Sequence, residues 1–370
     1  MLIDLSRARH HLERLVAIPS ISAQGTLEAA KYVAGVLTES GQTVEFLPAS
    51  NGRDANVIAY SSDRGGLILS GHLDVVPVTD QSWEKAPFSL TETDGALWGR
   101  GVTDMKSFIA LTLALAEQPG LPPLIWAFSW GEEIGCLGVR DMLPRLTARN
   151  PWGCLIGEPT ELKPVIAHRG RASFRVKLHG LPVHSSRADL GRNAIHALAH
   201  LVRDMDEAHQ LFASFGPFSE SFEPPHSSVQ VNMINGGSAP NIVAGAAQAL
   251  IEVRLVPDDD IDSIRASIEK AMARLNVDGT WEMETYTPAF FSSADSLLAT
   301  LVADAARAAP VSAPFATEAG LYQGAGIPTV VCGPGSIRQA HIADEFITFD
   351  ALASGGAFLG RLVETRYKWP

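Results

Sequence analysis

Short, almost uninterrupted apolar runs recur along the chain, and each is typical of a strand buried on both faces of a parallel sheet. The clearest begin at Leu67 and Leu124, and further strands are predicted over 44–47, 56–60, 154–157 and 327–332. Apolar residues at a helical spacing predict helices over 4–18, 26–40, 105–117 and 293–309, and a last helix from about Phe349. This alternation predicts an α/β domain with a mainly parallel, twisted sheet flanked by helices.

The pattern changes after His168. Residues 171–180 alternate between apolar and polar, as in a strand with one wet face, and 191–212 have a helical spacing. Strands follow at 228–234, 248–256 and 281–286, and the acidic run Asp258–Asp260 begins a helix between the last two. The order β-α-β-β-α-β is that of a ferredoxin-like fold. We therefore expect one domain formed by residues 1–168 and 287–370, with an α+β domain of residues 169–286 inserted into it.

Composition adds limits to this picture. A chain of 370 residues exceeds what one compact core usually supports, and 46% hydrophobic residues is ordinary for a globular enzyme. No apolar run approaches the roughly 20 residues that span a bilayer. The net charge of −12 argues against nucleic acid or an anionic membrane as a partner. Three distant cysteines and no basic-then-apolar N-terminal segment lead us to expect a cytoplasmic protein without disulfides.

The first candidate for chemistry is His72, at the end of the strand that begins at Leu67. Asp74 follows two positions later, and residues two apart in a strand share a face. A histidine that binds a metal ion usually has its second ring N–H held by a carboxylate, which fixes the tautomer. We therefore interpret His72 as a metal ligand and Asp74 as the partner that orients it.

Other acidic residues and a second histidine stand at comparable positions. Glu132-Glu133 and Glu158 end two further strands, Asp104 lies at the N-terminus of the predicted helix 105–117, and His341 follows the last strand. Ligands of open α/β sheets gather at the carboxyl ends of strands, so we expect these side chains to meet. Two imidazoles and three carboxylates suit a pair of zinc-like ions that share one carboxylate. One of the adjacent glutamates would remain free to accept a proton from water.

Five motifs in this order resemble those of the acetylornithine deacetylase/succinyl-diaminopimelate desuccinylase family of metal-dependent aminoacylases and dipeptidases. They are Ser-Gly-His72-Leu-Asp74-Val-Val-Pro, Gly-Arg-Gly-Val-Thr-Asp104-Met-Lys, Glu132-Glu133, Gly-Glu158-Pro-Thr and Ala-His341. Each motif is weak alone, but together they are specific, and the resemblance covers nearly the whole chain.

The resemblance implies a dinuclear amidohydrolase with two divalent ions, zinc first and cobalt as an alternative. Asp104 would bridge the ions, His72 and Glu158 would hold one of them, and Glu133 and His341 would hold the other. Glu132 would be the general base, and Asp74 would orient His72.

The resemblance extends into the predicted insert, which would act as a lid and dimerisation domain. His184 in Val-His-Ser-Ser is similar to a lid histidine that reaches the partner's site in a homodimer and stabilises the oxyanion. Asn241 and Arg254 match positions that contact the substrate, and Arg254 could bind an α-carboxylate. A ferredoxin-like insert also exposes a sheet edge, which favours two-fold pairing.

The segment around Glu318 bears on the substrate. Thr317–Gln323 and the residues before His341 resemble acetylornithine deacetylases most, which implies hydrolysis of N2-acetyl-L-ornithine to L-ornithine and acetate in arginine biosynthesis. The acidic Glu318 would attract the ammonium of ornithine and repel a succinyl tail. Alternatively, it faces solvent or supports a metal ligand. Desuccinylation of diaminopimelate and dipeptide cleavage are the alternatives within the family, and a metal-free binding relative is the alternative outside enzymes.

Overall fold

The computed structural model describes residues 1–370, which form two compact units. Unit 1 comprises Met1–Ile166, Phe291–Val311 and Thr317–Pro370, and unit 2 comprises Ala167–Phe290 and Ser312–Ala316. Unit 2 therefore begins two residues before the predicted insert, ends four residues after it, and includes a short segment from later in the chain.

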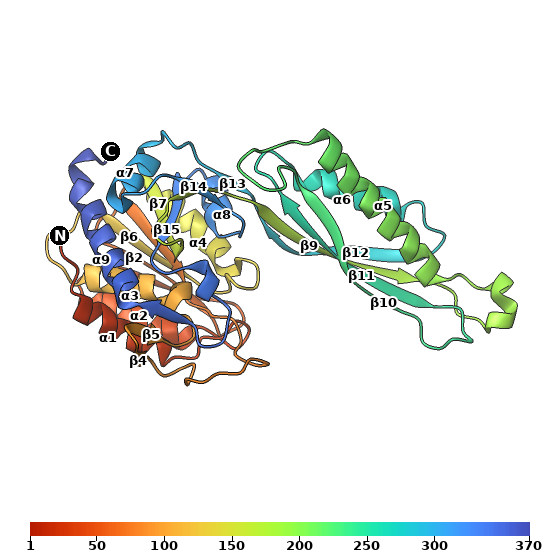
Figure 1. Ribbon diagram of the computed structural model, residues 1–370, viewed down its shortest axis with the longest axis horizontal. Coiled ribbons are helices and arrows are strands. Elements are labelled where there is room, and N and C mark those ends of the chain that lie inside the picture. The colour runs from red at the N-terminus through yellow and green to blue at the C-terminus, as the bar shows by residue number, and fades with distance from the viewer. The chain divides into compact units, whose positions relative to one another are not determined.

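A nine-stranded sheet forms the centre of unit 1 (Figure 1). Its strands are β1 (Thr43–Pro48), β2 (Ala55–Tyr60), β3 (Leu67–His72), β6 (Leu124–Ser129), β7 (Gly153–Pro159), β8 (Val165–His168), β13 (Phe290–Phe291), β14 (Val311–Ala313) and β15 (Thr329–Gly333). The last two residues of β8 and of β14 and the first of β13 are assigned to unit 2. The strands lie in the order β1-β2-β6-β3-β7-β15-β8-β13, with β14 beside β8. The central strands β6, β3, β7 and β15 pair in parallel, while the pairs β1–β2 and β2–β6 are antiparallel. This confirms the predicted, mainly parallel sheet.

Helices flank the sheet of unit 1. They are α1 (Leu5–Val16), α2 (Leu27–Glu39), α3 (Ser107–Ala116), α4 (Leu137–Ala148), α7 (Leu297–Ala306), α8 (Ala319–Gly324) and α9 (Phe349–Glu364). Helices α1, α2, α3, α7 and α9 share one hydrophobic core with the sheet, and α4 and α8, which the sequence did not predict, lie outside that core. A small antiparallel sheet of β4 (Thr91–Thr93), β5 (Ala96–Trp98) and β16 (Phe346–Thr348) completes the unit. None of the helices combines the length and apolar character needed to cross a bilayer.

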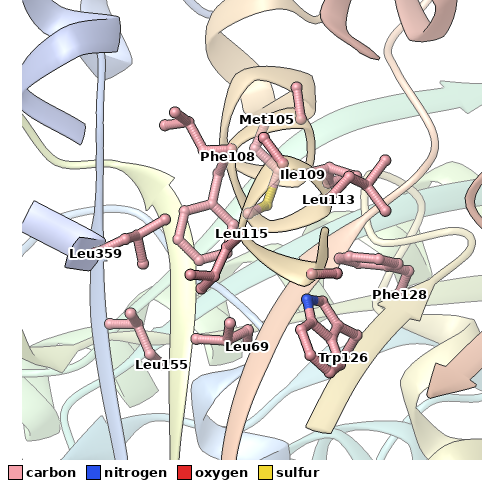
Figure 2. Close-up of a cluster of buried hydrophobic side chains, with 14 of the residues drawn as sticks. Leu69, Met105, Phe108, Ile109, Leu113, Leu115, Trp126, Phe128, Leu155 and Leu359 are labelled. Carbon is pink, nitrogen blue, oxygen red and sulfur yellow. The ribbon is translucent and has the colours of Figure 1, made fainter. Parts of the chain in front are cut away.

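Helix α3 is buried on every side, because it is apolar all round. Figure 2 shows its side chains packed against Leu69 of β3, Trp126 of β6, Leu155 of β7 and Leu359 of α9. The approach to β7 requires a glycine, since a Cβ atom on Gly157 would lie 1.9 Å from the Phe108 ring. This packing brings the turn before α3 to the carboxyl ends of the parallel strands.

Unit 2 has the predicted ferredoxin-like order. Its strands are β9 (Gly170–His179), β10 (Ser228–Gly236), β11 (Ala246–Leu255) and β12 (Asp278–Thr287), and its helices are α5 (Ala194–Phe215) and α6 (Ile261–Met272). The strands pair antiparallel in the order β10-β11-β9-β12, with both helices against the sheet (Figure 1). Asn193 caps α5 and Asp260 caps α6, because each side chain accepts a hydrogen bond from a backbone N–H of the first turn.

Candidate metal centre

The predicted ligands meet at the carboxyl edge of the central strands of unit 1. His72 is the last residue of β3, and Glu158 lies near the end of β7, the neighbouring strand. Glu132 and Glu133 follow β6, the neighbour of β3 on its other side, and His341 lies on the segment after β15. Parallel strands present their carboxyl ends at one edge, so residues far apart in the sequence come together there.

Three buried side chains form what we call the first set: His72, Asp104 and Glu158. Their donor atoms lie within 4.8 Å of one another. His72 Nε2 is 3.0 Å from Asp104 Oδ1 and 3.7 Å from Glu158 Oε1. An imidazole with two carboxylates at this spacing is a donor set that suits Zn²⁺.

The second set, Asp104, Glu133 and His341, shares Asp104 with the first. His341 Nε2 lies 3.0 Å from Glu133 Oε1 and 3.3 Å from Asp104 Oδ2, so the two oxygens of Asp104 face different imidazoles. The side chain of His341 is 51% exposed, and its backbone is left-handed with φ +64°. The second set is therefore more open than the first.

Glu132 lies close to both sets. Its carboxylate oxygen, the donor nitrogen of His72 and the carboxylate oxygen of Glu133 all lie within 4.8 Å of one another. Burial, together with the neighbouring carboxylates of Glu133 and Glu318, raises the pKa of Glu132 well above its usual value. Its Oε1 also lies 3.7 Å from the thiol of Cys136. A carboxylate with a raised pKa can take up and release a proton near neutral pH.

Asp74 lies beside His72 as predicted and also makes contacts that the sequence did not predict. Strand β3 ends at His72, and His72 Nδ1 lies 2.9 Å from the backbone oxygen of Asp74 but 3.7 Å from its carboxylate. That carboxylate also accepts hydrogen bonds from the backbone N–H groups of Glu132 at 3.1 Å and Glu133 at 3.3 Å. The hydroxyl of Ser22 donates to it at 2.7 Å. Asp74 thus holds the backbone of the glutamate pair in place.

The acidic groups of the centre affect one another's protonation. Burial raises the pKa of Glu158 well above its usual value, and the charge of Asp104 adds to this effect. Burial also raises the pKa of Glu133. Hydrogen bonds to Asp104 and Glu133 raise the pKa of His341 to about 10. So much negative charge in one buried place calls for a compensating cation.

These residues fit a pair of divalent metal ions. Each set offers one imidazole nitrogen and two carboxylates, and the two oxygens of Asp104 are divided between the sets. Nitrogen and oxygen donors of this kind are those that Zn²⁺ and Co²⁺ accept. The predicted ligands would therefore hold one ion in each set, with Asp104 between them.

The turn that carries Asp104 differs from the prediction. Helix α3 begins at Ser107, so Asp104 lies in the wide, irregular turn Val102–Lys106, three residues before the helix. Gly101 enters the turn with φ +81°, and a Cβ atom there would lie 2.6 Å from the Val75 side chain. The turn thus depends on glycine for both its backbone angle and its space.

Two buried charged residues beside this turn had no role assigned from sequence. Arg100 and Glu345 are each 1% exposed and form an ion pair of 2.9 Å across 245 positions of the chain. Arg100 stands inside the Gly-Arg-Gly motif and Glu345 four residues after His341, which is the only signal that could have found them.

The remaining predicted residues lie elsewhere. Glu318 is buried in unit 1, where its carboxylate accepts a hydrogen bond of 2.6 Å from the Ser129 hydroxyl, and burial raises its pKa to about 7.

The other three predicted residues, His184, Asn241 and Arg254, belong to unit 2. His184 and Asn241 lie on neighbouring segments, since the N–H of Ser185 donates to the Asn241 carbonyl oxygen. Arg254, on β11, forms an ion pair of 2.7 Å with Glu252.

Known proteins resemble the chain over nearly its whole length. The acetylornithine deacetylase of Edwardsiella ictaluri is 31% identical over 373 aligned positions, which cover 94% of this chain and 95% of the relative. The acetylornithine deacetylase of Shigella sonnei is 32% identical over 357 positions, covering 90% and 91%. A crystal structure of a tripeptidase from Staphylococcus aureus has the same fold, with a TM-score of 0.78 and 17% identity over 100% of both chains.

The family comparison agrees with the site. Residues 68–365 match peptidase family M20/M25/M40, a range that includes every side chain of both sets. Together with the two deacetylases, this match confirms the family predicted from the five motifs. The chain therefore belongs to peptidase family M20/M25/M40 and is a metal-dependent hydrolase.

Proposed function

We propose that the protein is a dinuclear deacylase of N-acyl amino acids, with N2-acetyl-L-ornithine as its leading substrate. The observation that carries this proposal is the single carboxylate of Asp104, whose two oxygens face His72 and His341. Two sets that share one ligand suit two adjacent ions. The name of the two relatives, acetylornithine deacetylase, supports the acetyl group and ornithine as the substrate's parts.

Hydrolysis of such a substrate breaks the amide C–N bond and forms a new C–O bond. When bound, two divalent ions, zinc or alternatively cobalt, would polarise the carbonyl group and lower the pKa of water. The chain must then move a proton from the attacking water to the departing amino group. Glu132 is the group we assign to this transfer, because its partly buried carboxylate lies beside both sets and its pKa is raised.

The residues of unit 2 are part of the proposal through the family resemblance. His184 would stabilise the oxyanion from the partner subunit of a homodimer, while Asn241 and Arg254 would contact the substrate. Mixing inactive His184→Ala and Glu132→Gln subunits should then restore part of the activity, because a mixed dimer holds one complete site. Full activity of a strictly monomeric protein would contradict this assignment.

The buried position of Glu318 favours one of its two predicted roles. A carboxylate that is 1% exposed and hydrogen-bonded to Ser129 is better placed to support the site from within the fold than to contact an ammonium group. Selectivity for ornithine over a succinylated substrate would then have another origin. Desuccinylation and dipeptide cleavage remain the alternative reactions to test.

The experiment that tests the proposal is a substrate screen of the purified protein with added zinc or cobalt. N-acetyl-ornithine, N-acetyl-norvaline, N-succinyl-diaminopimelate and a dipeptide should be compared by kcat/KM. We expect N-acetyl-ornithine to be hydrolysed fastest, and activity to disappear with a chelator and return with the metal. A preference for the succinylated substrate or the dipeptide would replace the proposed substrate. No hydrolysis of any of the four would favour a binding protein.

A further inference from the structure

We propose that Glu345, paired with Arg100, is a positioning residue that holds His341 and Asp104 at the spacing that the second set requires. The inference rests on the proposed function in one respect, which is that the second set binds a metal ion. Neither residue belongs to the five proposed ligands, and neither contacts the substrate in our account.

The carboxylate of Glu345 closes the turn that carries Asp104. Its Oε1 accepts hydrogen bonds from the backbone N–H groups of Thr103 at 2.8 Å and Asp104 at 3.0 Å. Its Oε2 accepts one from the N–H of Gly101 at 2.8 Å. Because Glu345 is 1% exposed, water cannot readily take its place. One buried carboxylate therefore satisfies three backbone donors of a single turn.

Arg100 connects this carboxylate to the segment that carries His341. Its Nη1 donates to Glu345 Oε2 at 2.9 Å and to the backbone oxygen of Ile342 at 3.2 Å, and its Nη2 donates to Gln81 Oε1 at 2.6 Å. The side-chain amide of Gln81 in turn donates to the backbone oxygen of His341 at 2.7 Å. A continuous series of hydrogen bonds thus joins the backbone around Asp104 to the backbone of His341.

The His341 segment depends on such support because it has no regular secondary structure to fix it. His341 and Asp344 both have left-handed backbones, with φ +64° and +52°, a conformation that is uncommon outside glycine although His and Asp adopt it more readily than most residues. Asp344 is held by the backbone N–H groups of Glu84 and Lys85, each within about 3.2 Å. A ligand on an irregular segment keeps its position only while contacts of this kind fix it.

The first set does not share this requirement to the same degree. His72 and Glu158 lie on β3 and β7, neighbouring strands of the sheet, so the backbone pairing already fixes their positions. Only Asp104 of the first set touches Glu345. Loss of the Glu345 carboxylate should therefore weaken metal binding at the second set much more than at the first.

Double variants separate the two sets. His72→Ala leaves only the second set complete, and His341→Ala leaves only the first. Each would be prepared with and without Glu345→Gln, stripped of metal, and titrated with Co²⁺ by calorimetry and visible absorption. In Glu345→Gln an NH₂ group replaces one carboxylate oxygen and cannot accept hydrogen bonds from the donors that this oxygen bound, which are Arg100 and Gly101 for Oε2 or Thr103 and Asp104 for Oε1. Groups that orient metal ligands typically change affinity 10–100-fold when they are mutated.

We therefore expect Glu345→Gln to weaken Co²⁺ binding about 10–100-fold in the His72→Ala background and less than about 3-fold in the His341→Ala background. Arg100→Lys should also weaken Co²⁺ binding at the second set, by a smaller factor. It replaces Glu345→Gln in the test if that variant does not fold. Exposed Glu92, which pairs with Arg9, provides the matched control Glu92→Gln. Leu359→Ala, a core variant in Figure 2, controls for a general loss of stability.

Equal losses at both sets, or no loss at either, would overturn the inference. The inference would also be overturned if Leu359→Ala weakened Co²⁺ binding with the same preference for the second set, because the preference would then follow stability alone. If the wild type binds no Co²⁺ at all, the proposed metal centre fails, and the inference fails with it. If the wild type binds Co²⁺ at both sets and Glu345→Gln does not change this, only the positioning role fails.

Discussion

The two halves of the metal centre are built from different parts of the fold. In the first set, the side chains of His72, Asp104 and Glu158 are 1%, 7% and 6% exposed, and two of them lie on adjacent strands. In the second set, His341 is 51% exposed and comes from a left-handed position on an irregular segment. Asp104 is common to both.

The difference shows two ways in which a fold can fix the position of a proposed metal ligand. The sheet itself places the first set, because the parallel pairing of β3 with β7 determines where the two strands end. The second set depends on separate supports. The carboxylate of Asp74 holds the backbone of Glu133, and we propose that Arg100 and Glu345 hold His341. Supports of this kind are dispersed in the sequence and act only once the fold has formed.

The largest effect is expected at Glu132, which lies within reach of both sets. If it is the proton acceptor and not a ligand, Glu132→Gln should lower kcat about 1,000-fold while both metal ions stay bound. Glu133→Gln is the matched variant, with the same change of charge one residue away, and it should weaken the metal ion of the second set. Activity assays and metal analysis of both proteins measure this.

Loss of a metal ion in Glu132→Gln would show that Glu132 is a metal ligand and would contradict its role as the proton acceptor. Full metal content with equal loss of activity in both variants would remove our distinction between the two glutamates.

The next largest effect separates the histidines. His72→Ala and His341→Ala should each weaken one metal ion by about 100-fold or more, since each removes a ligand outright. Added imidazole should restore activity only to His341→Ala, because that position is half exposed while His72 is 1% exposed. A titration of kcat/KM against imidazole concentration measures the rescue. Equal rescue of both variants, or of His72→Ala alone, would contradict the contrast in accessibility.

The smallest effect on activity is expected at Glu318, behind the first set. Its pKa rises from 4.5 to about 7 on burial, so the folded protein is stabilised when Glu318 is protonated. That contribution to the free energy of unfolding is complete below about pH 4.5 and is lost as the pH rises through about 7. The loss is about 3 kcal/mol at most. Urea unfolding at several pH values should show that Glu318→Gln removes part of the wild type's loss of stability between pH 5 and 8.

Glu318→Gln also tests the substrate role. We expect similar kcat/KM changes for N-acetyl-ornithine and the neutral N-acetyl-norvaline, because the carboxylate is buried against Ser129. A loss of kcat/KM for N-acetyl-ornithine alone would instead support the contact between Glu318 and the substrate's ammonium group that the sequence predicted.

The sequence predicted the parallel sheet and the ferredoxin-like unit from the spacing of apolar residues, and it indicated the candidate ligands from polar residues near strand ends. The division of these ligands into two sets came from the resemblance of five motifs. Apolar runs mark the strands of a buried parallel sheet, and polar residues at their ends must converge. Local patterns could not show that β3 ends at His72, so that Asp74 turns its carboxylate to the Glu132–Glu133 backbone. Nor could they pair Arg100 with Glu345 across 245 positions, since only tertiary packing brings them together.

The central claim is that the two sets bind two metal ions and that hydrolysis depends on them. The most direct measurement is a titration of metal-free protein with Zn²⁺ or Co²⁺, with metal content and hydrolysis of N-acetyl-ornithine followed in the same samples. We predict that two equivalents bind per chain and that activity appears as they bind. Full activity in the metal-free protein, or binding of no metal by the intact chain, would contradict the account.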